Sequence, residues 1–104
     1  MALHEQLSAG RWRTLSLAEQ LGNVGSEVGR AISWRERGNE SYAERALDLL
    51  DLTICDGRWT GRWRRELTRA RESLCSDFLN RDDAALRSLD CYFGAFAMLA
   101  RRAR

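Results

Sequence analysis

The chain of 104 residues contains no proline, no lysine and one histidine. The absence of proline removes the residue that most often interrupts a helix, so long helices are permitted throughout. Because His4 is the single histidine, Ser–His catalysis, Cys–His catalysis and histidine-based metal sites have almost no support in the sequence. Glycine-rich phosphate-binding loops of the G-x-x-x-x-G-K-[ST] or G-x-G-x-x-G type are missing as well. We therefore expect no catalytic residues, no metal site and no cofactor, and we predict that the protein is not an enzyme.

Cysteines and long apolar runs are also scarce. Cys55, Cys75 and Cys91 are odd in number, far apart and without a C-x-x-C pair, which is typical of buried free thiols in a reducing compartment. No apolar run reaches the roughly 18 to 20 residues that cross a bilayer. The first 13 residues lack the apolar stretch of a secretory signal. These features predict a cytoplasmic protein that does not enter a membrane.

The chain does contain apolar residues at spacings of three and four, the pattern of amphipathic helices. We predict helices over 16–37, 40–56 and 60–79, and a fourth that begins at Asp83 or Ser88 and closes with arginines. Short connections between four helices favour an all-α, four-helix antiparallel bundle.

The predicted helix ends rest on capping signals. Ser16 and Glu19 form the S-x-x-E capping box of the first helix, and Asn39 is the expected cap of the second. Residues 1–14 carry no apolar stripe and are predicted to be an N-terminal tail held by Trp12, whereas 15–104 form a single helical bundle domain. In the third helix the residues expected to face the core are Trp63, Leu67, Ala70, Leu74 and Phe78.

Residues 58–71, RWTGRWRRELTRAR, combine six arginines and two tryptophans with one glutamate. At about 100° per residue, four of the arginines gather on the side opposite the core, with Trp59 beside them. In one interpretation, which we favour, this row pairs with the acidic second helix across an intramolecular or intersubunit seam. In another, it binds the phosphates of nucleic acid while Trp59 stacks on bases, and in a third it is only solvated. The four arginines are Arg58, Arg62, Arg65 and Arg69.

Two further faces suggest contact with another helix. Gly22, Gly25 and Gly29 form a strip of small residues on the first helix, which favours close packing within the bundle or, alternatively, against a second subunit. In the last helix the apolar residues Cys91, Ala95 and Met98 lie away from the expected core side. We interpret this second face as a self-association surface.

A polar constellation is predicted opposite the core side of the first helix. It consists of Asn23, Glu27, Arg30 and Trp34, with the tryptophan one turn after the arginine. A cation can stack on an indole ring at this spacing. The constellation is interpreted as a stacked and paired surface patch, with a small polar binding site as the alternative.

Three segments in a fixed order carry a resemblance. SLAEQLGNVGSEVGRAISWRERGN, YAERALDLLDLTICD and RWRRELTRARE together resemble a family of short, uncharacterised prokaryotic helical proteins, with similarity over about residues 11–79. The resemblance implies a small helical protein and supplies no catalytic residues.

The sequence therefore predicts a non-catalytic helical-bundle interaction module that forms a homo-oligomer, with a further protein partner as an option. The alternative is a nucleic-acid-binding accessory protein, for RNA or DNA, that uses the arginine-rich third helix. A metal-dependent hydrolase built on helical carboxylates is a distant third hypothesis, because the tight E-E-x-x-E spacing is missing.

Overall fold

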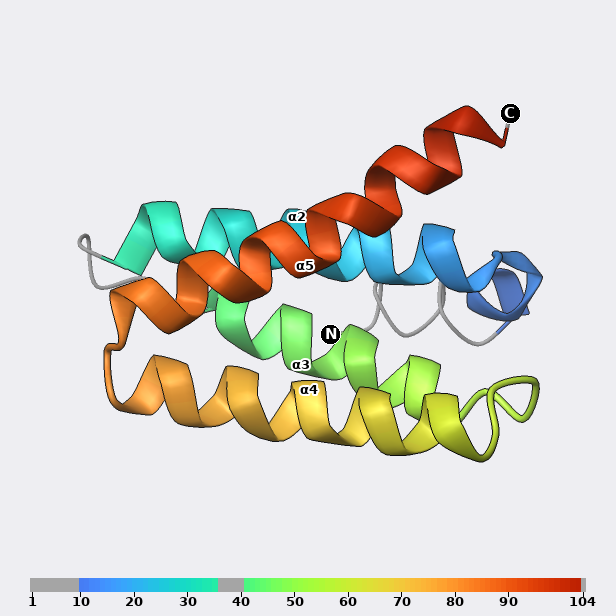
Figure 1. Ribbon diagram of the computed structural model, residues 1–104, viewed down its shortest axis with the longest axis horizontal. Coiled ribbons are helices and arrows are strands. Elements are labelled where there is room, and N and C mark those ends of the chain that lie inside the picture. The colour runs from blue at the N-terminus through green and yellow to red at the C-terminus, as the bar shows by residue number, and fades with distance from the viewer. Residues whose placement is uncertain (1–9, 36–40, 104) are drawn as a thin grey trace.

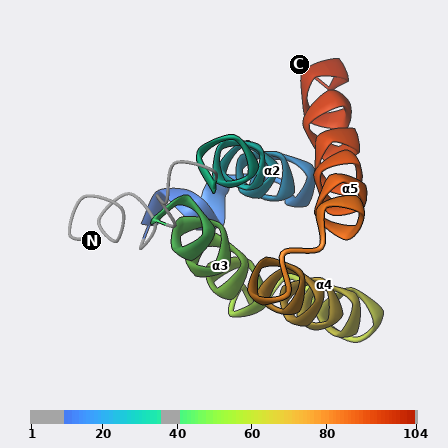
Figure 2. The ribbon, with the colours of Figure 1, turned by 90° about the vertical axis from the view of Figure 1, so that its left-hand side faces the viewer.

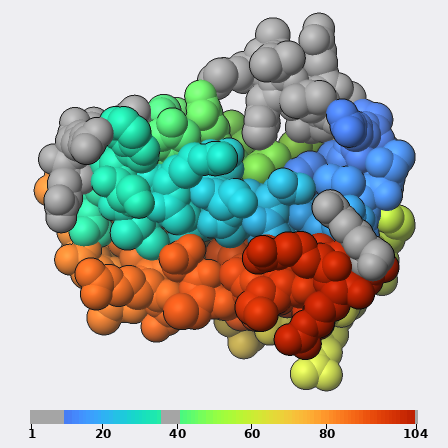
Figure 3. Space-filling view, turned by 90° about the horizontal axis from the view of Figure 1, so that it is seen from above, coloured from blue at the N-terminus to red at the C-terminus, as the bar shows by residue number. Residues whose placement is uncertain are grey.

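The computed structural model describes residues 10–35 and 41–103, and in these ranges it contains helices and no strand. Consecutive long helices run in opposite directions (Figure 1), and the last one returns to lie beside the first (Figures 2 and 3). The predicted all-α antiparallel four-helix bundle is thereby confirmed. In chain order the elements are a 3-10 helix η1 (Trp12–Thr14) and the α-helices α2 (Leu17–Trp34), α3 (Ser41–Ile54), α4 (Arg62–Leu79) and α5 (Asp83–Arg102).

Local capping explains where the helices begin. The Ser16 hydroxyl accepts a hydrogen bond from the Glu19 backbone N–H at 3.1 Å, and the Glu19 carboxylate accepts one from the Ser16 N–H at 3.0 Å, which confirms the capping box. The Asp82 carboxylate accepts from the Ala85 N–H and fixes the start of α5 at Asp83. The alternative start at Ser88 is therefore wrong. Asn39, the expected cap of α3, lies outside the described residues.

The core fills the space between the four helices. Every long helix contributes fully buried apolar side chains, and Trp12 of η1, only 7% exposed, closes one end. Burial of this apolar area is the main favourable term in folding. The largest fully buried apolar residues are Leu21, Val24, Val28, Leu50, Leu67, Leu74, Leu86 and Phe93.

The small residues of α2 are used inside the bundle. A Cβ added to Gly25 would lie 2.8 Å from the Cβ of Phe93, and one added to Gly22 would lie 3.0 Å from the Cα of Ala97. A Cβ on Gly29 would be 3.5 Å from the carboxylate of Asp90. The favoured interpretation, close packing within the bundle, therefore describes Gly22 and Gly25, and the alternative of a second copy is wrong because α5 of the same chain occupies that space.

Helix α5 diverges from α4 toward its C-terminal end (Figure 1). Trp63, near the start of α4, meets only the edge of the Phe96 ring at a centroid distance of 6.1 Å and is 37% exposed. The prediction that Trp63 belongs to the buried core stripe is therefore wrong. Trp63 does lie on the predicted side of α4, but α5, the helix that faces this side, has diverged from α4 near the start of α4.

Candidate interaction surfaces

Two of the predicted phosphate-binding residues belong to a polar network instead. Arg58 lies in the α3–α4 loop, where its Nη2 donates to Asp56 Oδ2 and to the Leu15 carbonyl, each at 2.7 Å. Its guanidinium also covers the ring of Trp59 at 4.5 Å from the centroid. The indole N–H of Trp59 donates to Gln20 Oε1 at 2.8 Å. Arg58 is exposed as predicted but is paired with Asp56, and the Trp59 ring is partly buried beneath it, so the prediction of an unpaired arginine beside a free stacking ring is wrong here.

The same network ties the N-terminal segment to the bundle. Gln20 is fully buried and donates through Nε2 to the Trp12 carbonyl at 2.8 Å and to Asp56 Oδ2 at 3.0 Å. Thr53, also fully buried, accepts from the Trp12 indole N–H at 3.1 Å. The hydrogen bonds from the Arg58 side chain hold the pKa of Asp56 well below its usual range. Gln20 is not among the residues predicted from the sequence, although it stands one turn before the buried Val24 and so shares the core stripe.

Three arginines of the predicted row are exposed on α4. Arg62, Arg65 and Arg69 have no carboxylate oxygen within 4 Å in the part of the chain that the structure describes. Arg65 and Arg69 line a shallow, open depression on the outer side of this helix. Because their charges are not neutralised by an intramolecular partner, this surface is able to attract anions.

Pairing between the acidic and basic helices is limited. Among the described residues, α3 and α4 are linked by one ion pair, in which Arg71 Nε donates to Asp51 Oδ1 at 2.5 Å and Nη2 to Oδ2 at 3.2 Å. The Asp51 carboxylate raises the pKa of Arg71. Of the row predicted to pair with the acidic second helix, Arg58 does so through Asp56, whereas Arg62, Arg65 and Arg69 do not within the described ranges, and the pair through Arg71 was not predicted.

The predicted self-association face of α5 is exposed. Cys91 and Ala95 are exposed, Met98 is 52% exposed, and Leu99 beside it is 53% exposed. Cys55 is exposed as well and Cys75 is only partly buried, so the expectation of buried thiols is wrong. An exposed apolar strip of this kind on a helix is typical of a contact with another macromolecule.

The polar constellation on α2 has partners within the chain. Arg30 forms an ion pair with Glu27 at 2.9 Å, and the Asn23 side-chain amide donates to the Glu19 carbonyl at 3.0 Å. The ring of Trp34 lies 6.4 Å from that of Tyr42 on α3. This ring contact of Trp34 is thus with Tyr42 rather than with Arg30, and the interpretation as a surface patch stays a prediction.

The described residues contain neither a candidate metal site nor a candidate membrane span. In the ranges 10–35 and 41–103, His, Cys, Asp and Glu side chains do not gather in groups of three or more that could hold a metal ion. Over the same ranges, no helix is both long enough and apolar enough to cross a membrane.

No protein-family model, curated protein or solved structure matches this chain. The resemblance to short prokaryotic helical proteins therefore stays a prediction.

Proposed function

We propose that this protein is a non-catalytic helical-bundle interaction module that self-associates through the outer face of α5. The observation that carries the proposal is a row of exposed residues spaced alternately by four and three positions, here called the α5 seam. This spacing is the one at which a helix keeps contact with a second helix along its length. The seam consists of Ala84, Ser88, Cys91, Ala95, Met98 and Arg102.

The α5 seam is self-complementary for an antiparallel contact. When two copies of α5 run in opposite directions about an axis at position 93, Cys91 faces Ala95 of the partner subunit and Ser88 faces Met98 of the partner subunit. Such a contact is isologous, the usual form in homodimers. The small residues at its centre allow two helix backbones to approach closely, as small residues do elsewhere.

Charge at the two ends of α5 supports the same orientation. The helix begins with Asp82 and Asp83 and ends with Arg101 and Arg102. An antiparallel pair brings the acidic start of one helix near the basic end of the other, whereas a parallel pair brings like charges together. Complementary charges of this kind set orientation more than they add affinity.

The oligomeric state tests the proposal. Sedimentation velocity or light scattering on the wild-type protein should give a mass above the 11.9 kDa of one chain. Ala95→Glu places a charge at the centre of the α5 seam and should yield the monomer. Ser73→Glu, a change at a small exposed residue of α4, is the matched control and should keep the wild-type mass. A wild-type protein that stays monomeric at roughly millimolar concentration, where even weak contacts form, would refute the proposal.

A cross-link tests the orientation separately. Ala95→Cys should form a disulfide with Cys91 of the partner subunit under mild oxidation, since directly facing residues fall within the distance that a disulfide bridges. Ser73→Cys should not. A dimer band of equal strength for both variants in a non-reducing gel would indicate random collision and contradict the antiparallel contact.

A second candidate function is nucleic-acid binding, favoured by the unpaired Arg62, Arg65 and Arg69 on α4. Three phosphate contacts would make the logarithm of affinity fall with the logarithm of salt concentration at a slope of about −2 to −3. Fluorescence anisotropy with labelled RNA and DNA at several salt concentrations measures this slope. The double variant Arg62→Glu and Arg65→Glu should abolish binding, whereas Arg71→Gln, which alters the ion-paired arginine, should leave most of it. Retained binding in the double variant would reject the site.

A further inference from the structure

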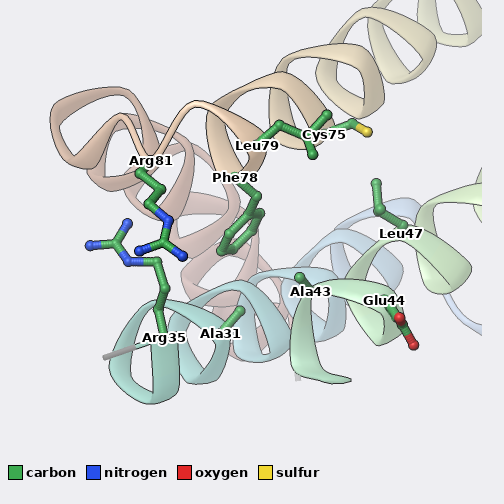
Figure 4. Close-up of a pocket in the computed structure, with 9 residues that line it drawn as sticks. All are labelled: Ala31, Arg35, Ala43, Glu44, Leu47, Cys75, Phe78, Leu79 and Arg81. Atoms are coloured by element: carbon green, nitrogen blue, oxygen red, sulfur yellow. The ribbon is translucent and has the colours of Figure 1, made fainter. Parts of the chain in front are cut away.

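A cavity of about 310 Å³ lies where α2 and α4 end and α3 begins. Its walls are apolar over most of their area and come from all three helices (Figure 4). Leu79, at 78% exposure the most exposed of the large apolar residues described, lies on its rim. The volume is at the lower end of the range for small-molecule sites, which are also mostly apolar with a few polar groups. The apolar wall residues are Ala31, Ala43, Leu47, Phe78 and Leu79.

Two arginines stand at one end of this cavity. Figure 4 shows that the side chains of Arg35 and Arg81 extend toward one another from the end of α2 and from the turn after α4. Arg35 forms an ion pair with Asp83 through Nη2, while its Nη1 is buried without a hydrogen-bond partner among the described residues. A buried donor without an acceptor costs free energy, and two neighbouring guanidinium groups repel each other. An oxyanion between them would relieve both costs.

The backbone also directs Arg81 to this place. Arg81 has φ of 52°, in the left-handed region that residues other than glycine rarely occupy. The turn that contains it links α4 to α5, and its N–H donates to the Phe78 carbonyl at 3.3 Å. The Asp82 N–H also donates to the Asp77 carbonyl at 3.0 Å, and the two bonds together form the Schellman motif, in which a left-handed residue ends the helix. The turn thus sets the direction in which the Cα–Cβ bond of the exposed Arg81 leaves the backbone.

We propose that this cavity binds a small amphipathic carboxylate, with its carboxylate between Arg35 and Arg81 and its alkyl or aryl body against the apolar walls. The planar guanidinium group matches a carboxylate in a bidentate arrangement. Glu44, the acidic residue among the described lining residues, points away from the arginines (Figure 4), so it does not compete for them. A ligand with an anionic head group at one end and an apolar body at the other fits a cavity with two arginines at one end and apolar walls.

Isothermal titration of the full-length protein with sodium octanoate tests the site. We expect one saturable site per chain, a rise in the melting temperature, and much weaker binding of acetate, which lacks the body, and of octylammonium, which has the opposite charge. Arg81→Gln should lower the affinity for octanoate by about tenfold or more, because it removes a charge-assisted hydrogen bond. Ala43→Phe, which fills the cavity, should abolish binding. Arg87→Gln, at an exposed arginine of α5 outside the cavity, is the matched control and should bind as the wild type does.

Three results would overturn the proposal. The first is the absence of saturable octanoate binding by the folded wild-type protein, and the second is equal affinity for octylammonium. The third is an equal loss in Arg81→Gln and Arg87→Gln, which would indicate general charge attraction. Because Arg81 is exposed, Arg81→Gln tests the site even if Ala43→Phe fails to fold, and circular dichroism of both variants identifies that failure.

Discussion

The contact between α2 and α5 gives the sharpest prediction about stability. In Gly25→Ala the new Cβ would lie 2.8 Å from the Cβ of the fully buried Phe93, whereas carbon atoms in good contact are about 3.5–4.0 Å apart. The two helices must therefore separate by roughly 0.7–1.2 Å. Overpacking of this kind costs about 1–3 kcal/mol, and the better helix propensity of alanine offsets about 1 kcal/mol. We expect a net loss of about 1 kcal/mol in the free energy of unfolding.

Urea denaturation followed by far-UV circular dichroism at a fixed protein concentration measures this loss, since self-association would otherwise alter the midpoint. Gly94→Ala is the matched control, because a Cβ at this position of α5 would meet no described atom within 4 Å. It should raise the free energy of unfolding by up to about 1 kcal/mol through helix propensity alone. The two variants should thus shift the urea midpoint in opposite directions. If Gly25→Ala stabilises the protein as much as Gly94→Ala does, the close α2–α5 contact is refuted.

Three further predictions concern the polar groups. Hydrogen bonds from the Arg58 side chain are the main cause of the lowered pKa of Asp56. Because the pKa is lower in the folded state, the Asp56 carboxylate stabilises the fold at pH values above its unfolded-state pKa of about 4. Asp56→Asn should therefore destabilise the protein at neutral pH, and in urea titrations at several pH values its difference from wild type should shrink as the pH falls below about 4. Trp12→Phe removes the indole N–H that donates to the Thr53 hydroxyl and should lower the free energy of unfolding by about 1 kcal/mol in the same assay. An unchanged free energy of unfolding would refute that hydrogen bond. The Tyr92 hydroxyl is buried without a partner among the described residues, so Tyr92→Phe should leave the urea midpoint unchanged or raise it, and a lowered midpoint would reveal a missing acceptor.

The sequence by itself determined the helical class and several helix ends. The reason is that these features depend on short-range interactions, such as the reciprocal hydrogen bonds between Ser16 and Glu19, which lie within one turn. The period of the apolar residues likewise fixes which side of each helix is buried, as for Val24 on α2 and Leu67 on α4. Short connections then leave few arrangements other than an antiparallel bundle.

Only the tertiary structure decided how each face is used. The sequence pattern of the strip that contains Gly25 is compatible with packing against α5 and with packing against another subunit. The position of Phe93 beside Gly25 shows that the strip packs against α5. Trp63 has the helical phase of a core residue but is partly exposed, because α5 diverges from α4 at that level. Arg58 likewise continues the spacing of an arginine row, yet a loop turns it toward Asp56. Helical periodicity determines the direction of a side chain relative to its own helix axis, whereas its partners depend on the crossing angles and loop paths of segments far away in the chain.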